Sequence, residues 1–276
     1  MKKIIALILT LACALTLGAC SSNTGKGNED DTTLTVSCTL SPHCQILEYT
    51  KDIFEKDYGL TLEIIELDDY YIFNKALDAG EVDANFFQHV PFFNGEVAAN
   101  GYNISNVAGI HIEPFGFYSK TIDSVDAIPD GAEVILSNSV ADHGRILAIL
   151  EKAGLITLAA DVDRQNATVE DIIANSKNLT FTEVKPEMLT TVFEQGEGDL
   201  VAINGNYAIS AGLNPVEDTV ILEQADSTNP YVNIVACQKG HEKDAKIVAL
   251  VEVLKSEAVK NYIKETWSDG SVIPAE

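Results

Sequence analysis

Five short stretches of the chain combine side chains that could bind a small polar molecule. In the first, Asp-Ala-Asn-Phe-Phe-Gln-His-Val-Pro-Phe-Phe at 83–93, four phenylalanines surround His89. Aromatic walls with one placed polar group suit a small apolar ligand that has a polar end. Taken alone, the stretch is explained first by core packing of the phenylalanines, with Gln88 and His89 at the start of a helix.

A second stretch, Asn-Ser-Val-Ala-Asp-His-Gly-Arg-Ile-Leu at 138–147, carries Arg145 near the start of an expected helix. A guanidinium is a fork of donors that can hold a carboxylate through two hydrogen bonds. Arginine is scarce in this acidic chain, which makes Arg145 the obvious local cation. The alternative is a surface ion pair, which contributes little to stability.

Two further stretches place asparagines beside apolar strands. Asn204 follows an expected strand in Ile-Asn-Gly-Asn-Tyr-Ala, and Asn233 closes Asn-Pro-Tyr-Val-Asn at the start of another. The amides of Asn204 and Asn206, just after the first of these strands, could bond the amine and the carboxylate of a ligand. A turn with an asparagine cap explains one of them equally well. The fifth stretch, 111–120, is aromatic and interrupted by Pro114 and Gly116, which suggests a crossing between two lobes.

Motifs for catalysis or nucleotide binding are missing. The chain has no GxGxxG, GxxxxGK[ST], HExxH or GxSxG, so we predict no catalytic residue and no cofactor. His43 and Cys44 could join His89 and His111 in a metal site, but no pair has ligand spacing, and we predict no metal. A Cys44–His89 nucleophile pair is the remaining enzymatic alternative.

These residues fall on an alternation of expected strands and helices, which predicts an α/β fold with mainly parallel sheets. The first series of strands and helices covers 34–38, 46–58, 60–67, 71–79, 82–87 and 90–100. The second covers 133–137, 144–153, 179–184, 186–195 and 200–203, followed by a buried strand at 231–237 and closing helices at 241–254 and 257–266. Two α/β lobes fit this pattern and length.

The N-terminal segment has the features of a secretory signal. Lys2 and Lys3 precede an apolar run at 4–17 that is too short to span a bilayer. Leu-Gly-Ala-Cys at 17–20 is similar to a bacterial lipoprotein signal, so we expect residues 1–19 to be removed and Cys20 to carry lipid. An ordinary signal peptide with a chance cysteine is the alternative. The polar residues 20–33 are expected to form a flexible tether.

Charge and cysteines restrict the partners and the compartment. The formal net charge is −24 and becomes −26 without Lys2 and Lys3, which disfavours nucleic acid and anionic lipid headgroups as partners. Outside the cytoplasm a disulfide can form. Cys38 and Cys44 could close one, or these two and Cys237 could all be small buried apolar residues, and the sequence leaves both alternatives open.

Together, DANFFQHVPFF, PFGFYSK, Gly144-Arg145, INGNYA and NPYVN resemble the NlpA/MetQ family, the substrate-binding lipoproteins of ABC-type methionine importers. The resemblance runs from about Leu34 to the C-terminus. It implies a two-lobed, periplasmic-binding-protein-like fold whose lobes are joined by crossing hinge strands. One lobe is expected from 34–115 and 231–276, and the other from 116–230.

The resemblance also implies roles for single residues. Arg145 would hold the carboxylate of an amino acid, and Asn204 and Asn233 would hold its carboxylate and amine. The ligand-binding residues that it implies are Tyr70, Phe87, His89, Phe92, Asn138, Arg145, Asn204 and Asn233. The implied ligand is L-methionine, whose thioether packs well against aromatic rings.

The implied function is that of a non-enzymatic carrier. It would be anchored at the cell membrane through the lipid on Cys20, outside the cytoplasm, and would deliver its ligand to the permease and ATPase of an ABC importer. Alternatives are the same fold binding another amino acid or a small methionine-containing peptide, or a hydrolase-type enzyme using His89 or Cys44.

The chain departs from the family in several places. Phe92 stands where tyrosine is usual, and Phe73 replaces a proline. Asp142 adds a negative charge near Arg145, where it could orient the guanidinium or weaken its hold on a carboxylate. These departures bear on which amino acid is bound.

Overall fold

The computed structural model describes residues 32–225 and 229–276, and Thr33–Glu276 forms one compact unit. The expected signal segment 1–19, Cys20, which is expected to carry lipid, and most of the expected tether 20–33 lie outside the described residues. In the part of the chain that the structure describes, no helix is long and apolar enough to cross a membrane.

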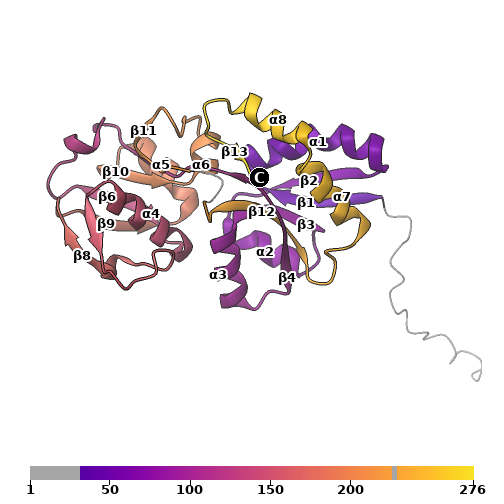
Figure 1. Ribbon diagram of the computed structural model, residues 1–276, viewed down its shortest axis with the longest axis horizontal. Coiled ribbons are helices and arrows are strands. Elements are labelled where there is room, and N and C mark those ends of the chain that lie inside the picture. The colour runs from indigo at the N-terminus through magenta and orange to yellow at the C-terminus, as the bar shows by residue number, and fades with distance from the viewer. Residues whose placement is uncertain (1–31, 226–228) are drawn as a thin grey trace, which may run out of the picture. The chain divides into compact units, whose positions relative to one another are not determined.

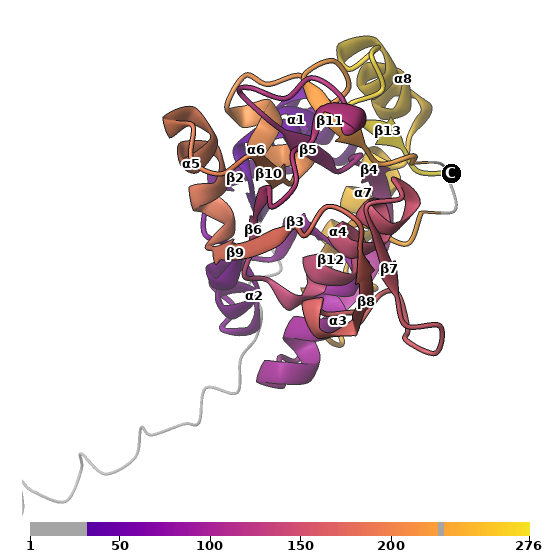
Figure 2. The same ribbon diagram turned by 90° about the vertical axis from the view of Figure 1, so that its left-hand side faces the viewer.

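Two sheets flanked by helices organise the unit, as expected for an α/β fold (Figures 1 and 2). The six strands of the first sheet lie in the order β13-β4-β12-β3-β1-β2. They are β1 (Thr33–Cys38), β2 (Thr61–Glu66), β3 (Ala84–His89), β4 (Ile104–Ile112), β12 (Val232–Gln238) and β13 (Ile273–Pro274). The helices beside this sheet are α1 (Gln45–Ile53), α2 (Tyr70–Asp78), α3 (Val90–Asn100), α7 (Ala245–Leu254) and α8 (Glu257–Thr266).

The second sheet has five strands in the order β11-β5-β10-β6-β9. They are β5 (Gly116–Tyr118), β6 (Glu133–Ser137), β9 (Thr180–Val184), β10 (Leu200–Ile203) and β11 (Thr219–Leu222). The elements around it are the helices α4 (Val140–Lys152), α5 (Leu189–Gln195) and α6 (Gly205–Ser210) and the two-stranded sheet of β7 (Ile156–Leu158) and β8 (Ile172–Asn175).

Both sheets mix parallel and antiparallel pairs. β1 runs parallel to β2 and β3, and β6 runs parallel to β9 and β10. β12 is antiparallel to β3 and β4, and β5 is antiparallel to β10 and β11. The chain leaves the first sheet after β4 and returns to it through β12. β4 leads out of the sheet and β12 leads back into it from the same end, so these neighbouring strands run in opposite directions.

Side chains of the second sheet alternate between two apolar layers, as the pleat of a strand requires. On β6, Val134 and Leu136 pack with α4, whereas Ile135 points to the layer that contains α5 and α6. On β10, Ala202 and Ile203 divide in the same way. The second layer also contains rings from the first sheet and its helices, so it joins the two sheets through apolar contact.

Two helix starts position aromatic rings in that shared layer. The carboxylate of Asp69 accepts the backbone N–H of Tyr71 at 2.9 Å and caps α2, which places Tyr70 in its first turn. The ring of His89 accepts the backbone N–H of Phe92 at 3.2 Å and caps α3. Such side-chain caps satisfy N–H groups that a helix leaves unpaired.

A disulfide joins Cys38, at the end of β1, to Cys44, and Cys237 is a buried free thiol. This resolves the choice that the sequence leaves open in favour of the Cys38–Cys44 bridge. The bridge holds the turn that carries His43 beside the end of β1.

Reduction should therefore lower the stability of this region. For a loop with a sequence separation of 6 residues, chain entropy predicts that the bridge contributes about 2 kcal/mol. We expect dithiothreitol to lower the free energy of unfolding of the wild type by this amount in urea titrations. The Cys38→Ala/Cys44→Ala variant is the control, because the reductant should leave it unchanged. An equal response of both proteins would contradict the prediction.

Candidate functional site

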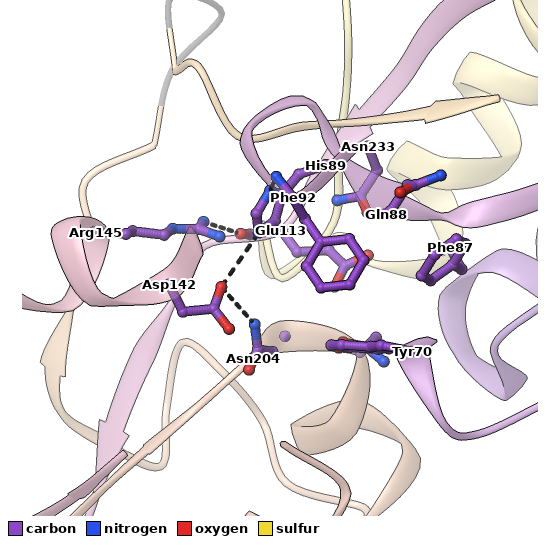
Figure 3. A pocket seen from close by; sticks show the side chains of 12 residues that line it. Tyr70, Phe87, Gln88, His89, Phe92, Glu113, Asp142, Arg145, Asn204 and Asn233 are labelled. Atoms are coloured by element: carbon purple, nitrogen blue, oxygen red, sulfur yellow. Dashed lines mark hydrogen bonds and ion pairs between the residues drawn. The ribbon is translucent and has the colours of Figure 1, made fainter. Parts of the chain in front are cut away.

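A pocket lies where the two sheets and the crossing segments meet (Figure 3). The cavity volume is about 20 Å³, which is room for little more than one water molecule and far below the range for small-molecule sites. The lining residues are Tyr70, Phe87, Gln88, His89, Phe92, Glu113, Asp142, Arg145, Asn204, Gly205, Asn206 and Asn233. Both sheets and their helices contribute, so the site depends on how the two meet.

One side of the pocket is aromatic. The ring centroids of Tyr70, Phe87 and Phe92 lie 5.7–5.9 Å from one another, within the range of favourable ring pairs. Burial raises the pKa of Tyr70 well above its ordinary value, so the phenol stays neutral. Its hydroxyl donates to Oδ1 of Asn206 at 2.5 Å. This side therefore offers apolar faces to a ligand.

Gln88 completes that side through a buried amide network. Its Nε2 donates to Oδ1 of Asn74 at 2.7 Å and to Oδ1 of Asn85 at 3.1 Å, and its Oε1 accepts from Asn74 at 2.8 Å. Because these bonds orient the amide, Gln88 is a rigid part of the pocket.

Arg145 lies on the opposite side, on α4, and is only 5% exposed. Its Nε donates to Oε1 of Glu223 at 3.0 Å, and its Nη2 donates to Oε2 of Glu223 and to the backbone oxygen of Glu113. The guanidinium also lies 4.4 Å from the ring centroid of Tyr231. Burial alone lowers the pKa of Arg145, but the charge of Glu223 outweighs it and the net shift is upward. Arg145 is thus a buried cation, and the surface ion pair is wrong.

Asp142 and Asn204 lie between Arg145 and the aromatic side (Figure 3). Oδ1 of Asp142 lies 3.3 Å from Nε2 of His89 and 3.4 Å from Nδ2 of Asn204, whose amide donates to it. Burial raises the pKa of Asp142, but the hydrogen bond from His89 and the charge of Arg145 lower it by more. The net shift is downward, so the group is a carboxylate at neutral pH. Asp142 accepts hydrogen bonds from His89 and Asn204 and none from Arg145, so it does not orient the guanidinium through a hydrogen bond.

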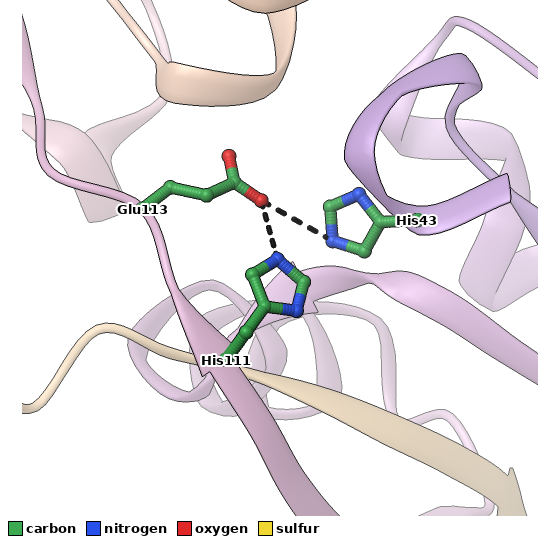
Figure 4. A group of neighbouring side chains, drawn as sticks. All are labelled: His43, His111 and Glu113. Carbon is green, nitrogen blue, oxygen red and sulfur yellow. Dashed lines mark hydrogen bonds and ion pairs between the residues drawn. The ribbon is translucent and has the colours of Figure 1, made fainter. Parts of the chain in front are cut away.

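Glu113, which lines the pocket, forms a buried cluster with His43 and His111 (Figure 4). Oε1 of Glu113 is 2.7 Å from Nε2 of His111 and 3.6 Å from Nε2 of His43. Nδ1 of His43 is 2.7 Å from Oγ1 of Thr39, and its Nε2 is 3.1 Å from Oδ1 of Asn233. Burial lowers the pKa of both histidines to about 3 and raises that of Glu113.

The cluster has the geometry of a hydrogen-bonded network. The three ligand atoms lie within 4.8 Å of one another, and Nε2 of His111 and Oε1 of Glu113 are at hydrogen-bond distance. Of the residues considered for a metal site, only His43 and His111 come together. Cys44 is oxidised to a disulfide and His89 bonds Asp142. The Cys44–His89 nucleophile pair is therefore wrong, because a disulfide sulfur is not a nucleophilic thiolate.

Seven of the eight ligand-binding residues expected from the sequence line the pocket. The eighth, Asn138, is exposed at the end of β6 and is not among the lining residues. No sequence motif indicates the roles of Glu113, Gln88 and Glu223. Glu223 has no local signal, since it meets Arg145 from 78 residues away.

The buried histidines predict a loss of stability in acid. Between pH 6.5 and about 3, His43 and His111 bind protons in the unfolded chain but stay neutral in the fold. The unfolded state then binds more protons, so the free energy of unfolding falls as the pH drops through this window, by up to about 1.4 kcal/mol per pH unit for each histidine.

Urea titrations across this window, on the wild type and His111→Gln, provide the measurement. The variant should lose stability less steeply, because one of the two protons is no longer involved. The raised pKa of Glu113 acts in the opposite sense above its ordinary 4.5, so the comparison of slopes is the informative quantity. Equal slopes would show that His111 is not the buried neutral group described.

Comparisons with known proteins agree with this arrangement. Residues 34–276 match the model of the NlpA lipoprotein family. The methionine-binding lipoprotein MetQ of Bacillus subtilis is 46% identical over 277 residues, which cover 99% of this chain and 99% of that protein.

Solved structures show the same fold. A lipoprotein from Bacillus subtilis subsp. subtilis has a TM-score of 0.86 at 46% identity, over 89% of this chain and 98% of that one. A nutrient-binding protein from Burkholderia cenocepacia, solved bound to methionine, has a TM-score of 0.82 at 33% identity, over 88% and 100% of the two chains. These relatives support a substrate-binding role. The chain belongs to the NlpA lipoprotein family.

Proposed function

We propose that this chain is the substrate-binding lipoprotein of an ABC importer and captures an amino acid, L-methionine, between two lobes. The lobes are 34–115 with 231–276, and 116–230. The observation that carries the proposal is the composition of the pocket, which combines aromatic rings with Arg145, Asn204 and Asn233. The names of the relatives from Bacillus subtilis and Burkholderia cenocepacia, which mention methionine, support the choice of ligand.

The aromatic side would receive the methionine side chain. Sulfur is polarisable, and each thioether–ring contact contributes roughly 0.3–1.5 kcal/mol. Tyr70, Phe87 and Phe92 meet at angles that leave both ring faces and ring edges near the pocket. Because Phe92 has no hydroxyl, this wall stays apolar at that position.

The carboxylate of the ligand would face Arg145 and Asn233. Of the guanidinium nitrogens of Arg145, Nη1 alone lacks a hydrogen-bond partner among the described residues. Asn233 accepts from His43 through Oδ1, which leaves its amide nitrogen to donate. Two donors that converge on one carboxylate, one of them charged, are the arrangement expected for its recognition.

The importer partners and the membrane location proposed here are those of the family. Lipid on Cys20 would anchor the protein at the cell membrane, outside the cytoplasm, and residues 20–33 would tether it there. The permease and ATPase of the importer would receive the ligand. A tether raises the effective concentration of the carrier at the permease without fixing its orientation.

Methionine should stabilise the protein against unfolding. A ligand that binds only the folded state adds about 2.7 kcal/mol when its concentration is 100 times Kd. Thermal and urea unfolding with all proteinogenic amino acids, D-methionine and methionine-containing dipeptides would measure this. We expect the largest effect with L-methionine. A panel in which nothing shifts the unfolding curve would contradict the proposal, and a larger effect of another amino acid would correct the ligand.

The role of Arg145 can be separated from its contribution to stability. Arg145→Ala leaves the largely buried Glu223 without its cation, although the backbone N–H of Phe115 still donates to it, and this should cost about 3–5 kcal/mol. The double variant Arg145→Met/Glu223→Leu replaces the whole ion pair with apolar side chains and should regain most of this stability. It should nevertheless fail to bind methionine in calorimetry.

The matched control is Ile173→Ala, which truncates an exposed apolar side chain on β8. It should bind methionine like the wild type. If the double variant is folded and binds with wild-type affinity, Arg145 does not hold the ligand.

A further inference from the structure

The two oxygens of the Asp142 carboxylate have unequal surroundings. Asp142 is 1% exposed. Its Oδ1 has both hydrogen-bond partners, His89 and Asn204, whereas its Oδ2 is buried and has none among the described residues. Oδ1 of Asn204, which is 6% exposed, lacks a partner in the same way. Two buried acceptors on neighbouring residues that line one pocket therefore await a donor, and a buried acceptor without one is costly.

The His89 hydrogen bond does not neutralise Asp142. Nδ1 of His89 accepts the backbone N–H of Phe92 at 3.2 Å, so the ring proton belongs on Nε2, which then donates to Asp142. In this tautomer His89 is a neutral donor. The carboxylate gains a hydrogen bond from it and no positive charge.

The nearest cation is also committed elsewhere. Arg145 forms a two-bond ion pair with Glu223, so its single charge is already matched. Asp142 lies in the first turn of α4, and the helix N-terminus contributes only a partial positive charge. Among Arg145, Glu223 and Asp142 one negative charge is therefore unmatched, and Glu113 is a further buried carboxyl in the lining. A buried charge requires a partner.

We propose that Oδ2 of Asp142 and Oδ1 of Asn204 bind the protonated amine of the ligand, which makes Asp142 the residue that selects ligands with a free ammonium group. An ammonium supplies both the missing charge and several N–H donors to the two oxygens. The inference rests on the proposed function, because it takes the pocket as the ligand site. It assigns the amine to Asp142 and Asn204, and the carboxylate to the donors of Arg145 and Asn233.

Three ligands and one substitution separate the two ends of the ligand. L-Methionine has both charged groups, L-methioninamide keeps only the ammonium, and N-acetyl-L-methionine keeps only the carboxylate. Calorimetry would measure the affinity of each for the wild type and for Asp142→Asn. The matched control is Asp126→Asn, which removes the same charge at an exposed position.

Removing one partner of a buried charge pair weakens binding by at least about 30-fold. We expect Asp142→Asn to lose affinity by this factor for methionine and methioninamide. For N-acetyl-methionine the fold-loss of affinity should be less than about a tenth as large. N-Acetyl-methionine should bind the wild type at least about 30-fold more weakly than methionine. Asn204→Ala should also lose affinity mainly for methionine and methioninamide. This second variant tests the inference if the Asp142→Asn protein does not fold.

The outcomes distinguish this inference from the proposed function. Methionine binding to the wild type with no loss in Asp142→Asn would overturn the role of Asp142 alone. Equal losses for all three ligands would show that Asp142 acts only on the fold. A wild type that binds none of the amino acids in the panel would overturn the proposed function together with this inference.

Discussion

Arg145 is buried at the point where the chain crosses between its two sheets, and a buried guanidinium needs its charge and its N–H groups matched by the surrounding protein. The partners come from both crossings. The backbone oxygen of Glu113 follows β4, Glu223 follows β11, and the ring of Tyr231 precedes β12. Satisfying one side chain on α4 thereby joins the outgoing segment, the returning segment and the second sheet. The position of the pocket follows from this constraint.

The rest of the site consists of groups placed around that buried charge. Aromatic rings fill the side away from it. The amides of Gln88, Asn74 and Asn85 form hydrogen bonds with one another. Between them remain donors on Arg145 and Asn233 and acceptors on Asp142 and Asn204. A molecule with an apolar side chain, a carboxylate and an ammonium matches these groups. In a chain with a net charge of −24, the local donors are what make an anionic group acceptable.

Local patterns predicted much of this structure because they depend on short-range spacing. The strand–helix alternation and the motifs around His89, Arg145 and Asn204 are continuous in sequence, and the structure brings these residues together. What depends on pairing across the chain was not predictable. β4 (Ile104–Ile112) is defined by its register with β12, and Glu223 acquires its role only by meeting Arg145. Asn138 follows a strand, as expected, but its side chain is exposed, which the local motif did not indicate.

Native mass spectrometry of the folded protein, purified from cells and then supplied with L-methionine, would show what the pocket holds. We expect one small molecule per chain with the mass of methionine, which leaves when the protein is denatured. We also expect methionine to displace any other amine-bearing occupant. A ligand without an amine that stays bound in excess methionine would contradict a pocket built for an amino acid.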